Sequence, residues 1–203
     1  MLLGPVLFAI ALLVGGLSYV YIKQGGALFL PSIDVSSFPE DQRHFFSMKG
    51  VKLLATARPS TTLSHLLREI HEGENSKVVS IDLISYDFSY KGYEPGNKWY
   101  EALKKVVEKR GKVRLLGGEP GEEREKDLKG LKELGAEVRI LDSPPRAHLF
   151  LLSRKNGPDF IWSEGWHEND RAVCIAYTRS PSEDDVKMAR DYFEERWERG
   201  RPL

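Results

Sequence analysis

Two histidines in the C-terminal half stand beside residues that could support nucleophilic or acid–base chemistry. His148 lies in the apolar run 147–152, and His167 lies between Glu164 and Glu168. A histidine can attack an electrophile or transfer a proton near neutral pH, and a carboxylate can orient its ring. Two interpretations of His148 stay open: a nucleophile, or a half-buried strand histidine hydrogen-bonded to backbone. Around His167 the alternative to a site is a polar surface loop.

Metal, disulfide and cofactor chemistry receive no support from the residue spacing. No pair of histidines has the spacing of metal ligands on one element, and no glycine-rich phosphate loop appears. The single cysteine, Cys174, lies in the apolar run 172–177 and is expected to be a small core residue. We therefore expect no metal and no cofactor. The other histidines, His44, His65 and His71, are predicted to be surface residues.

The composition limits the architecture and the partners. The chain has 203 residues, which suits one domain with an appendage. Lysine plus arginine number 30 and aspartate plus glutamate also number 30, so the net charge does not indicate a nucleic-acid partner. Charged residues make up 30% of the chain, with many neighbouring ion pairs of the kind found in heat-stable proteins, which points to a thermophile.

The chain begins with an uncharged run that starts at Leu2 and ends at Ile22. As a helix it would be about 30 Å long, the thickness of one bilayer core. We predict a single-pass transmembrane anchor at residues 1–23, through which the protein contacts the membrane. The alternative is a cleaved signal peptide, but no lysine or arginine follows the initiator and no Ala-x-Ala site follows the run. Lys23 favours a cytoplasmic soluble domain, and the side stays open.

The rest of the chain predicts an α/β domain at 49–203 after a tether or lead-in at 24–48, which is rich in glycine, proline and serine. Seven apolar runs read as strands: 51–57, 77–86, 112–116, 137–141, 147–152, 159–163 and 172–178. Helical periodicity marks four helices, one before Gly73 and others at 97–110, 122–134 and 183–199. The expected fold is a mixed β-sheet sandwiched by helices.

Two of the predicted helices carry more specific expectations. Ser60, Thr61 or Thr62 could cap the first. The last should be part of the core because apolar residues recur along it at intervals of three and four. These residues are Val186, Ala189, Tyr192, Phe193 and Trp197.

The order of these segments resembles one half of a phospholipase D-like protein, from residue 51 to residue 197. The family has a helix ending in Arg-Gly-Val-x-Val-Arg, a His-x-Lys motif on the next strand but one, and then a Gly-Ser pair. The corresponding segments are Arg-Gly-Lys-Val-Arg at 110–114, His-Leu-Phe at 148–150 and Trp-Ser at 162–163. The chain is thus identified as a single-motif, degenerate member.

The resemblance implies a phosphodiesterase mechanism of which this chain keeps only part. In the family, histidine attacks phosphorus, lysine stabilises the phosphate oxygens, and a second motif supplies the acid. His148 matches the nucleophile and Ser163 the serine, and both are the candidate catalytic residues. Phe150 stands in place of the lysine, and losing one such donor typically lowers the rate roughly 100- to 1000-fold. Arg154 and Lys155 are the candidate substitute cations.

Two functions follow from the resemblance. The first is a membrane-anchored, catalytically degenerate domain that acts as a binding or scaffold module, as a homodimer or with a paralogous subunit. The alternative is a phosphodiesterase for phospholipid or nucleic-acid diesters, with His148 as the nucleophile. Because single-motif members complete their site by dimerisation, the enzyme would need a second His148 from a two-fold partner.

Overall fold

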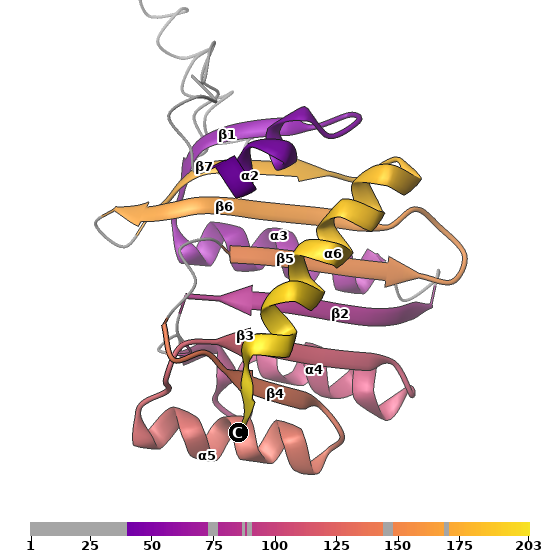
Figure 1. Cartoon of the computed structure of the whole chain (residues 1–203). Coiled ribbons are helices and arrows are strands. Elements are labelled where there is room, and N and C mark those ends of the chain that lie inside the picture. The colour runs from indigo at the N-terminus through magenta and orange to yellow at the C-terminus, as the bar shows by residue number, and fades with distance from the viewer. Residues whose placement is uncertain (1–39, 73–76, 87, 89–90, 144–147, 169–170) are drawn as a thin grey trace, which may run out of the picture.

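The seven predicted strands and one further short strand form a single mixed sheet in the computed structural model (Figure 1). The structure describes residues 40–72, 77–86, 88, 91–143, 148–168 and 171–203. The strands are β1 Lys52–Ala57, β2 Val78–Ser85, β3 Lys112–Gly117, β4 Glu137–Ile140, β5 His148–Arg154, β6 Phe160–Glu168, β7 Arg171–Thr178 and β8 Arg201–Pro202. All seven sequence-predicted strands are confirmed.

The sheet combines a parallel part with an antiparallel part. The strand order is β1-β7-β6-β5-β2-β3-β4-β8, with β2, β3 and β4 parallel and every other pair antiparallel. Parallel neighbours need a crossover, and helices α4 Lys98–Glu108 and α5 Glu122–Glu133 provide it. The antiparallel strands β5, β6 and β7 follow one another directly in the chain, as short connections allow.

Helices cover both faces of the sheet, as Figure 1 shows. Helices α3 Pro59–Glu72, α4 and α5 lie on one face, and α6 Glu183–Arg199 crosses the other. The buried residues accordingly form two clusters, and β5 contributes to both because its side chains alternate. Phe150 and Leu152 lie in the α3–α5 cluster, whereas Leu149 and Leu151 lie in the α6 cluster. The predicted sandwich of helices around a mixed sheet is confirmed.

Helix α3 starts earlier than the capping prediction assumed. It begins at Pro59, whose fixed φ and missing N–H suit the first helical position. Ser60, Thr61 and Thr62 therefore lie inside the first turn, and the prediction that one of them caps the helix is wrong. The other three predicted helices begin within one residue of their predicted starts, as α4 at Lys98, α5 at Glu122 and α6 at Glu183. Asn97 caps α4 by accepting the N–H of Trp99 at 3.0 Å, and Ser182 and Asp185 form a capping box on α6.

Helix α6 is attached to the sheet by apolar packing and by one buried arginine. Phe193 and Trp197 are buried, as predicted, and their rings stack at 5.4 Å. The Arg114 guanidinium lies 4.5 Å from the Phe193 ring. Its Nε donates to Asp82 Oδ1 at 2.6 Å, and its Nη1 lies 2.8 Å from Glu194 Oε1. A single side chain thus joins β2, β3 and α6.

Residues 40–48, at the end of the predicted tether or lead-in, are folded onto the same face as α6. They form α2 Glu40–Arg43 and the 3-10 helix η2 His44–Ser47, and Phe45, Phe46 and Met48 are buried in the α6 cluster. The Phe45 ring meets Tyr192 edge-on at 5.2 Å. Three apolar side chains explain why this stretch packs although its composition resembles a linker.

The predicted anchor at residues 1–23 and the tether up to residue 39 lie outside the described residues. Within the described part of the chain, no helix is long and apolar enough to cross a membrane.

We expect the Arg114→Met substitution to lower the free energy of unfolding by about 3 to 5 kcal/mol, because Asp82, 2% exposed, would keep a buried charge without its partner. Chemical denaturation measures this. The double substitution Arg114→Met with Asp82→Leu removes both charges and should recover a large part of the loss. If the loss of stability in the double variant equalled the sum of the losses in Arg114→Met and Asp82→Leu alone, the two charges would not stabilise each other.

Candidate functional site

His148 and Glu164 face each other across two antiparallel strands. The register pairs His148 with Glu164, Leu149 with Ser163 and Phe150 with Trp162. Directly paired residues point to the same face, so His148 and Glu164 share the α3 side of the sheet. His148 Nδ1 lies 3.8 Å from Glu164 Oε2. The structure therefore places a carboxylate next to the candidate nucleophile.

Glu164 is a buried carboxylate, 3% exposed, held by groups from two elements. Its Oε1 accepts the indole N–H of Trp162 and the hydroxyl of Thr62 on α3, both at 2.9 Å. Burying an ionised carboxylate is costly unless hydrogen bonds replace its water. Thr62 and Trp162 provide that replacement and fix the carboxylate beside His148.

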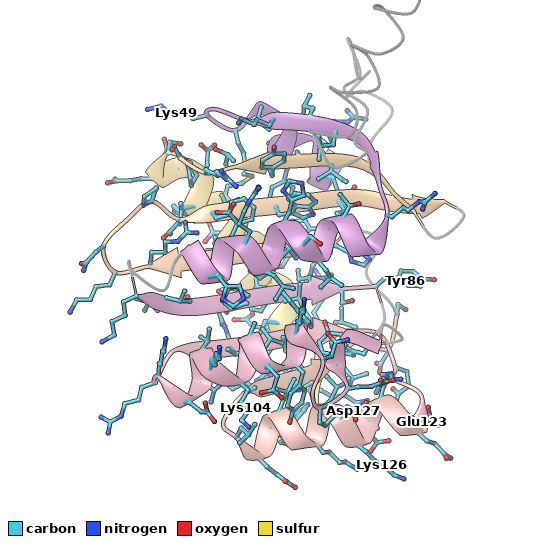
Figure 2. The ribbon with its side chains drawn as sticks, turned by 180° about the vertical axis from the view of Figure 1, so that it is seen from behind. Lys49, Tyr86, Lys104, Glu123, Lys126 and Asp127 are labelled. Carbon is cyan, nitrogen blue, oxygen red and sulfur yellow. The ribbon has the colours of Figure 1, made fainter. Side chains whose placement is uncertain are left out.

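The other ring nitrogen of His148 is hydrogen-bonded to the backbone. The Tyr86 N–H, just past the end of β2, donates to His148 Nε2 at 3.2 Å. In a neutral imidazole the nitrogen that accepts carries no proton, so this network assigns the proton to Nδ1, which faces Glu164. Figure 2 shows Tyr86 at the edge of the molecule, at one end of β2.

The two other positions of the family motif do not line this site. Phe150 is 1% exposed, with its ring 6.0 Å from that of Trp99 and 6.1 Å from that of Phe160. The place where the family has its lysine is therefore the packed core. Ser163 is paired with Leu149 and lies on the α6 face, so the structure does not bring it to His148.

Neither predicted substitute cation reaches His148, so that prediction is wrong. Arg154 ends β5, six residues away, which is about 20 Å along a strand. Its Nη2 lies 3.2 Å from Glu69 Oε2 and its Nη1 donates to the Pro158 carbonyl. Lys155 follows, and its N–H donates to the Lys77 carbonyl at the same far end.

The segment around His167 belongs to strand β6, not to a polar surface loop. β6 runs through Glu168, and the register pairs His167 with Ala172 of β7. Polar residues lengthen this strand beyond the predicted range because pairing with β7 satisfies their backbone. The side chains of His167, Glu168 and Cys174 lie outside the described residues. Among the residues that are described, no cluster of three or more histidine, cysteine or acidic side chains could hold a metal.

His65, predicted to be a surface residue, is half-buried, so that prediction holds only in part. From α3, its ring lies against the rings of Trp162 and Tyr177, with distances between ring centroids of 5.6 and 6.2 Å. Burial, followed by the charges of Arg68 and Arg179, lowers the pKa of His65 below its ordinary value of 6.5. His44 and His71 are exposed, as predicted.

Three polar residues on one side of α3, which the sequence analysis did not identify as a group, contact residues of the sheet. Thr62, His65 and Glu69 recur at intervals of three and four, so they share one side of the helix. Thr62 binds Glu164, His65 packs on Trp162, and Glu69 accepts from Arg154. This polar stripe faces the sheet, and such spacing beside an apolar face could have indicated buried polar contacts.

Solved structures with a fold similar to that of this chain are found. No family model and no curated protein matches the chain. It is similar to the crystal structure of a phospholipase D family member, Nuc from Salmonella typhimurium, with a TM-score of 0.49 and 15% sequence identity, over 75% of this chain and 97% of that one. At this identity no residue role passes from it to this chain.

The lowered pKa of His65 predicts a pH dependence of stability. Below pH about 6.5, His65 is protonated in the unfolded chain but not yet in the folded protein. The free energy of unfolding therefore decreases as the pH is lowered from about 6.5 to the pKa of His65 in the folded protein. Denaturant unfolding should show a smaller loss of stability between pH about 7.5 and about 5.5 in His65→Gln than in the wild type. Equal losses in the two proteins would contradict the assignment.

Proposed function

We propose that this protein is a membrane-tethered, phospholipase D-like domain that serves as a binding or scaffold module without catalytic turnover. The observation that carries this proposal is the position of Phe150. Its ring is enclosed by Trp99 and Phe160. A cation that stabilises a developing phosphoryl oxyanion would have to occupy that packed space.

The bonding of His148 supports the same proposal. An imidazole nitrogen attacks phosphorus with its lone pair, and the lone pair of Nε2 accepts the Tyr86 N–H. The proton on Nδ1 faces the fixed carboxylate of Glu164. His148 thus links the end of β2 to β6 through its two nitrogens, which is a structural task.

The phosphodiesterase remains the second candidate, and one observation favours it. The side chain of His148 is 19% exposed, and a buried carboxylate 3.8 Å from Nδ1 is the arrangement that orients a nucleophilic histidine. The reaction would additionally require a partner to supply the acid and the cation. A two-fold dimer would bring a second His148 as the acid.

An edge residue beside His148 favours a protein partner for the module. The Tyr86 side chain is 48% exposed although its backbone is bonded to His148. Exposed tyrosines are enriched in protein interfaces because the ring buries much area with little loss of side-chain freedom. We propose a second copy or a paralogous subunit as the partner at this edge.

An activity assay on the full chain in detergent separates the two functions. The substrates are a short-chain phospholipid, single-stranded DNA and a chromogenic phosphodiester, and the proteins are wild type, His148→Ala and His44→Ala. His44 is an exposed histidine on a different element, so its removal is the matched control. The scaffold proposal predicts turnover at the level of the blank in all three proteins, because the cation position is filled by Phe150.

Turnover in the wild type and in His44→Ala that disappears in His148→Ala would establish the phosphodiesterase. Phe150→Lys is not a fair test of a restored site, because it would bury an ammonium group in the core and is expected to destabilise the fold.

The anchor is tested by fractionation. Full-length protein should stay with membranes through high-salt and alkaline washes and dissolve only in detergent, because the uncharged run from Leu2 to Ile22 is long enough to span the bilayer. A chain that starts at Val35 keeps the packed residues 40–48 and should be recovered without detergent. Release of the full-length protein by salt alone would exclude an integral helix.

A further inference from the structure

A pocket of about 420 Å³ lies between α3, α4 and the first residues of β2. Its volume falls in the range of small-molecule sites. The pocket includes Val78, at the start of β2, whereas the His148 site adjoins Tyr86, past the other end of that strand. The two sites therefore lie at opposite ends of β2, and the pocket has no part in the proposed function above.

The walls of the pocket are aliphatic. They are formed by Ile70 of α3, Val78 of β2, and Ala102 and Val106 of α4. Ala102 and Val106 are four residues apart, so they lie on one face of the helix. Apart from the His71 imidazole, none of the eight lining residues is aromatic, and none is acidic or an amide. The lining thus provides no carboxylate or amide acceptor for sugar hydroxyls, and its aliphatic part suits a flexible hydrocarbon chain.

The remaining lining residues are all basic. They are His71, Lys77, Lys105 and Lys109. Lys105 of α4 and Lys109, the residue that caps its C-terminus, lie four residues apart, about one turn of helix. The chain as a whole is neutral, with 30 basic and 30 acidic side chains, so the described lining, which has four basic side chains and no acidic one, is a local concentration of positive charge. Such a concentration beside a low-dielectric wall attracts anions.

Lys77 has an unusual backbone conformation at this pocket. Its φ is +52°, in the left-handed region that side-chain-bearing residues rarely adopt. The Lys77 carbonyl accepts the N–H of Lys155 at 3.0 Å, which holds the residue in place and brings a second lysine backbone beside it. A strained residue held by its surroundings is a feature of ligand sites.

We propose that this pocket binds a single-chain anionic amphiphile, with the hydrocarbon chain along Ile70, Val78, Ala102 and Val106 and the anionic head at Lys77, Lys105 and Lys109. The head is a carboxylate or a phosphate, since both are recognised by lysine ammonium groups. The chain enters the aliphatic part for the same reason that apolar side chains are buried in the core.

The test uses the full chain in nanodiscs of phosphatidylcholine and a photoreactive dodecanoic acid with a diazirine near its methyl end. After irradiation, peptide mass spectrometry locates the label. We expect it on the peptides that contain Val78, Ala102 and Val106. Competition by dodecyl phosphate or by unlabelled dodecanoate identifies which head group is preferred. Dodecyl phosphocholine is the control that has the hydrocarbon chain but no net charge, and inorganic phosphate is the control that has the charge but no chain.

Three variants make the result specific. The double variant Lys105→Glu with Lys109→Glu should reduce labelling about tenfold, because two attractive charges become repulsive. Ala102→Trp should reduce it similarly by filling the pocket. Lys104→Glu changes the same charge on the same helix, but Lys104 is not a lining residue and pairs with Glu108, so it should label like the wild type. Circular dichroism confirms that each variant is folded.

Labelling elsewhere on the chain, or equal labelling in the wild type, the double lysine variant and Ala102→Trp, would overturn the proposal. Equal competition by dodecyl phosphocholine would show that charge is not recognised, and complete competition by inorganic phosphate would show that the hydrocarbon chain is not. Either outcome contradicts an anionic amphiphile as the ligand.

Discussion

The antiparallel register of β5 with β6 is the constraint on which the site depends. Because side chains alternate along both strands, one pairing places His148 beside Glu164, Phe150 in the aromatic core and Ser163 on the opposite face. A shift of one residue would exchange these positions. The strands thus place His148 at the start of β5, beside Glu164, and Phe150 among packed aromatic side chains.

Buried charges on the α3 face are stabilised by partners from neighbouring elements. Glu164 is held by Thr62 and Trp162, and Glu69 by Arg154. Each carboxylate is nearly inaccessible to water, so its bonds must replace hydration, and a helix that moved away from the sheet would leave a charge unpaired. The polar stripe of α3 therefore sets where this helix sits on the sheet.

Most of the fold could be predicted from the sequence because each of the seven longer strands contains a short apolar run and the crossover helices have a helical periodicity, whereas β8, an Arg-Pro pair, has no such pattern. The final helix matches its prediction of 183–199, since its capping box and its apolar spacing agree. The site could be predicted only in part. His148 at a strand end was visible, but its contact with Glu164 depends on a cross-strand register, and the burial of His65 depends on how α3 packs. Such contacts join residues far apart in the chain and leave no local pattern.

The proposed function requires His148 to be a hydrogen-bonded structural residue and not a nucleophile. Long-range proton–nitrogen NMR of histidine-labelled protein, assigned by comparison with His148→Ala, reports which ring nitrogen carries the proton. We expect a neutral ring protonated at Nδ1, with Nε2 as an acceptor, and no change in its signals when a phosphodiester or vanadate is added. A ring protonated at Nε2, or a shift of the Nε2 signal when vanadate binds, would contradict the structural role of His148.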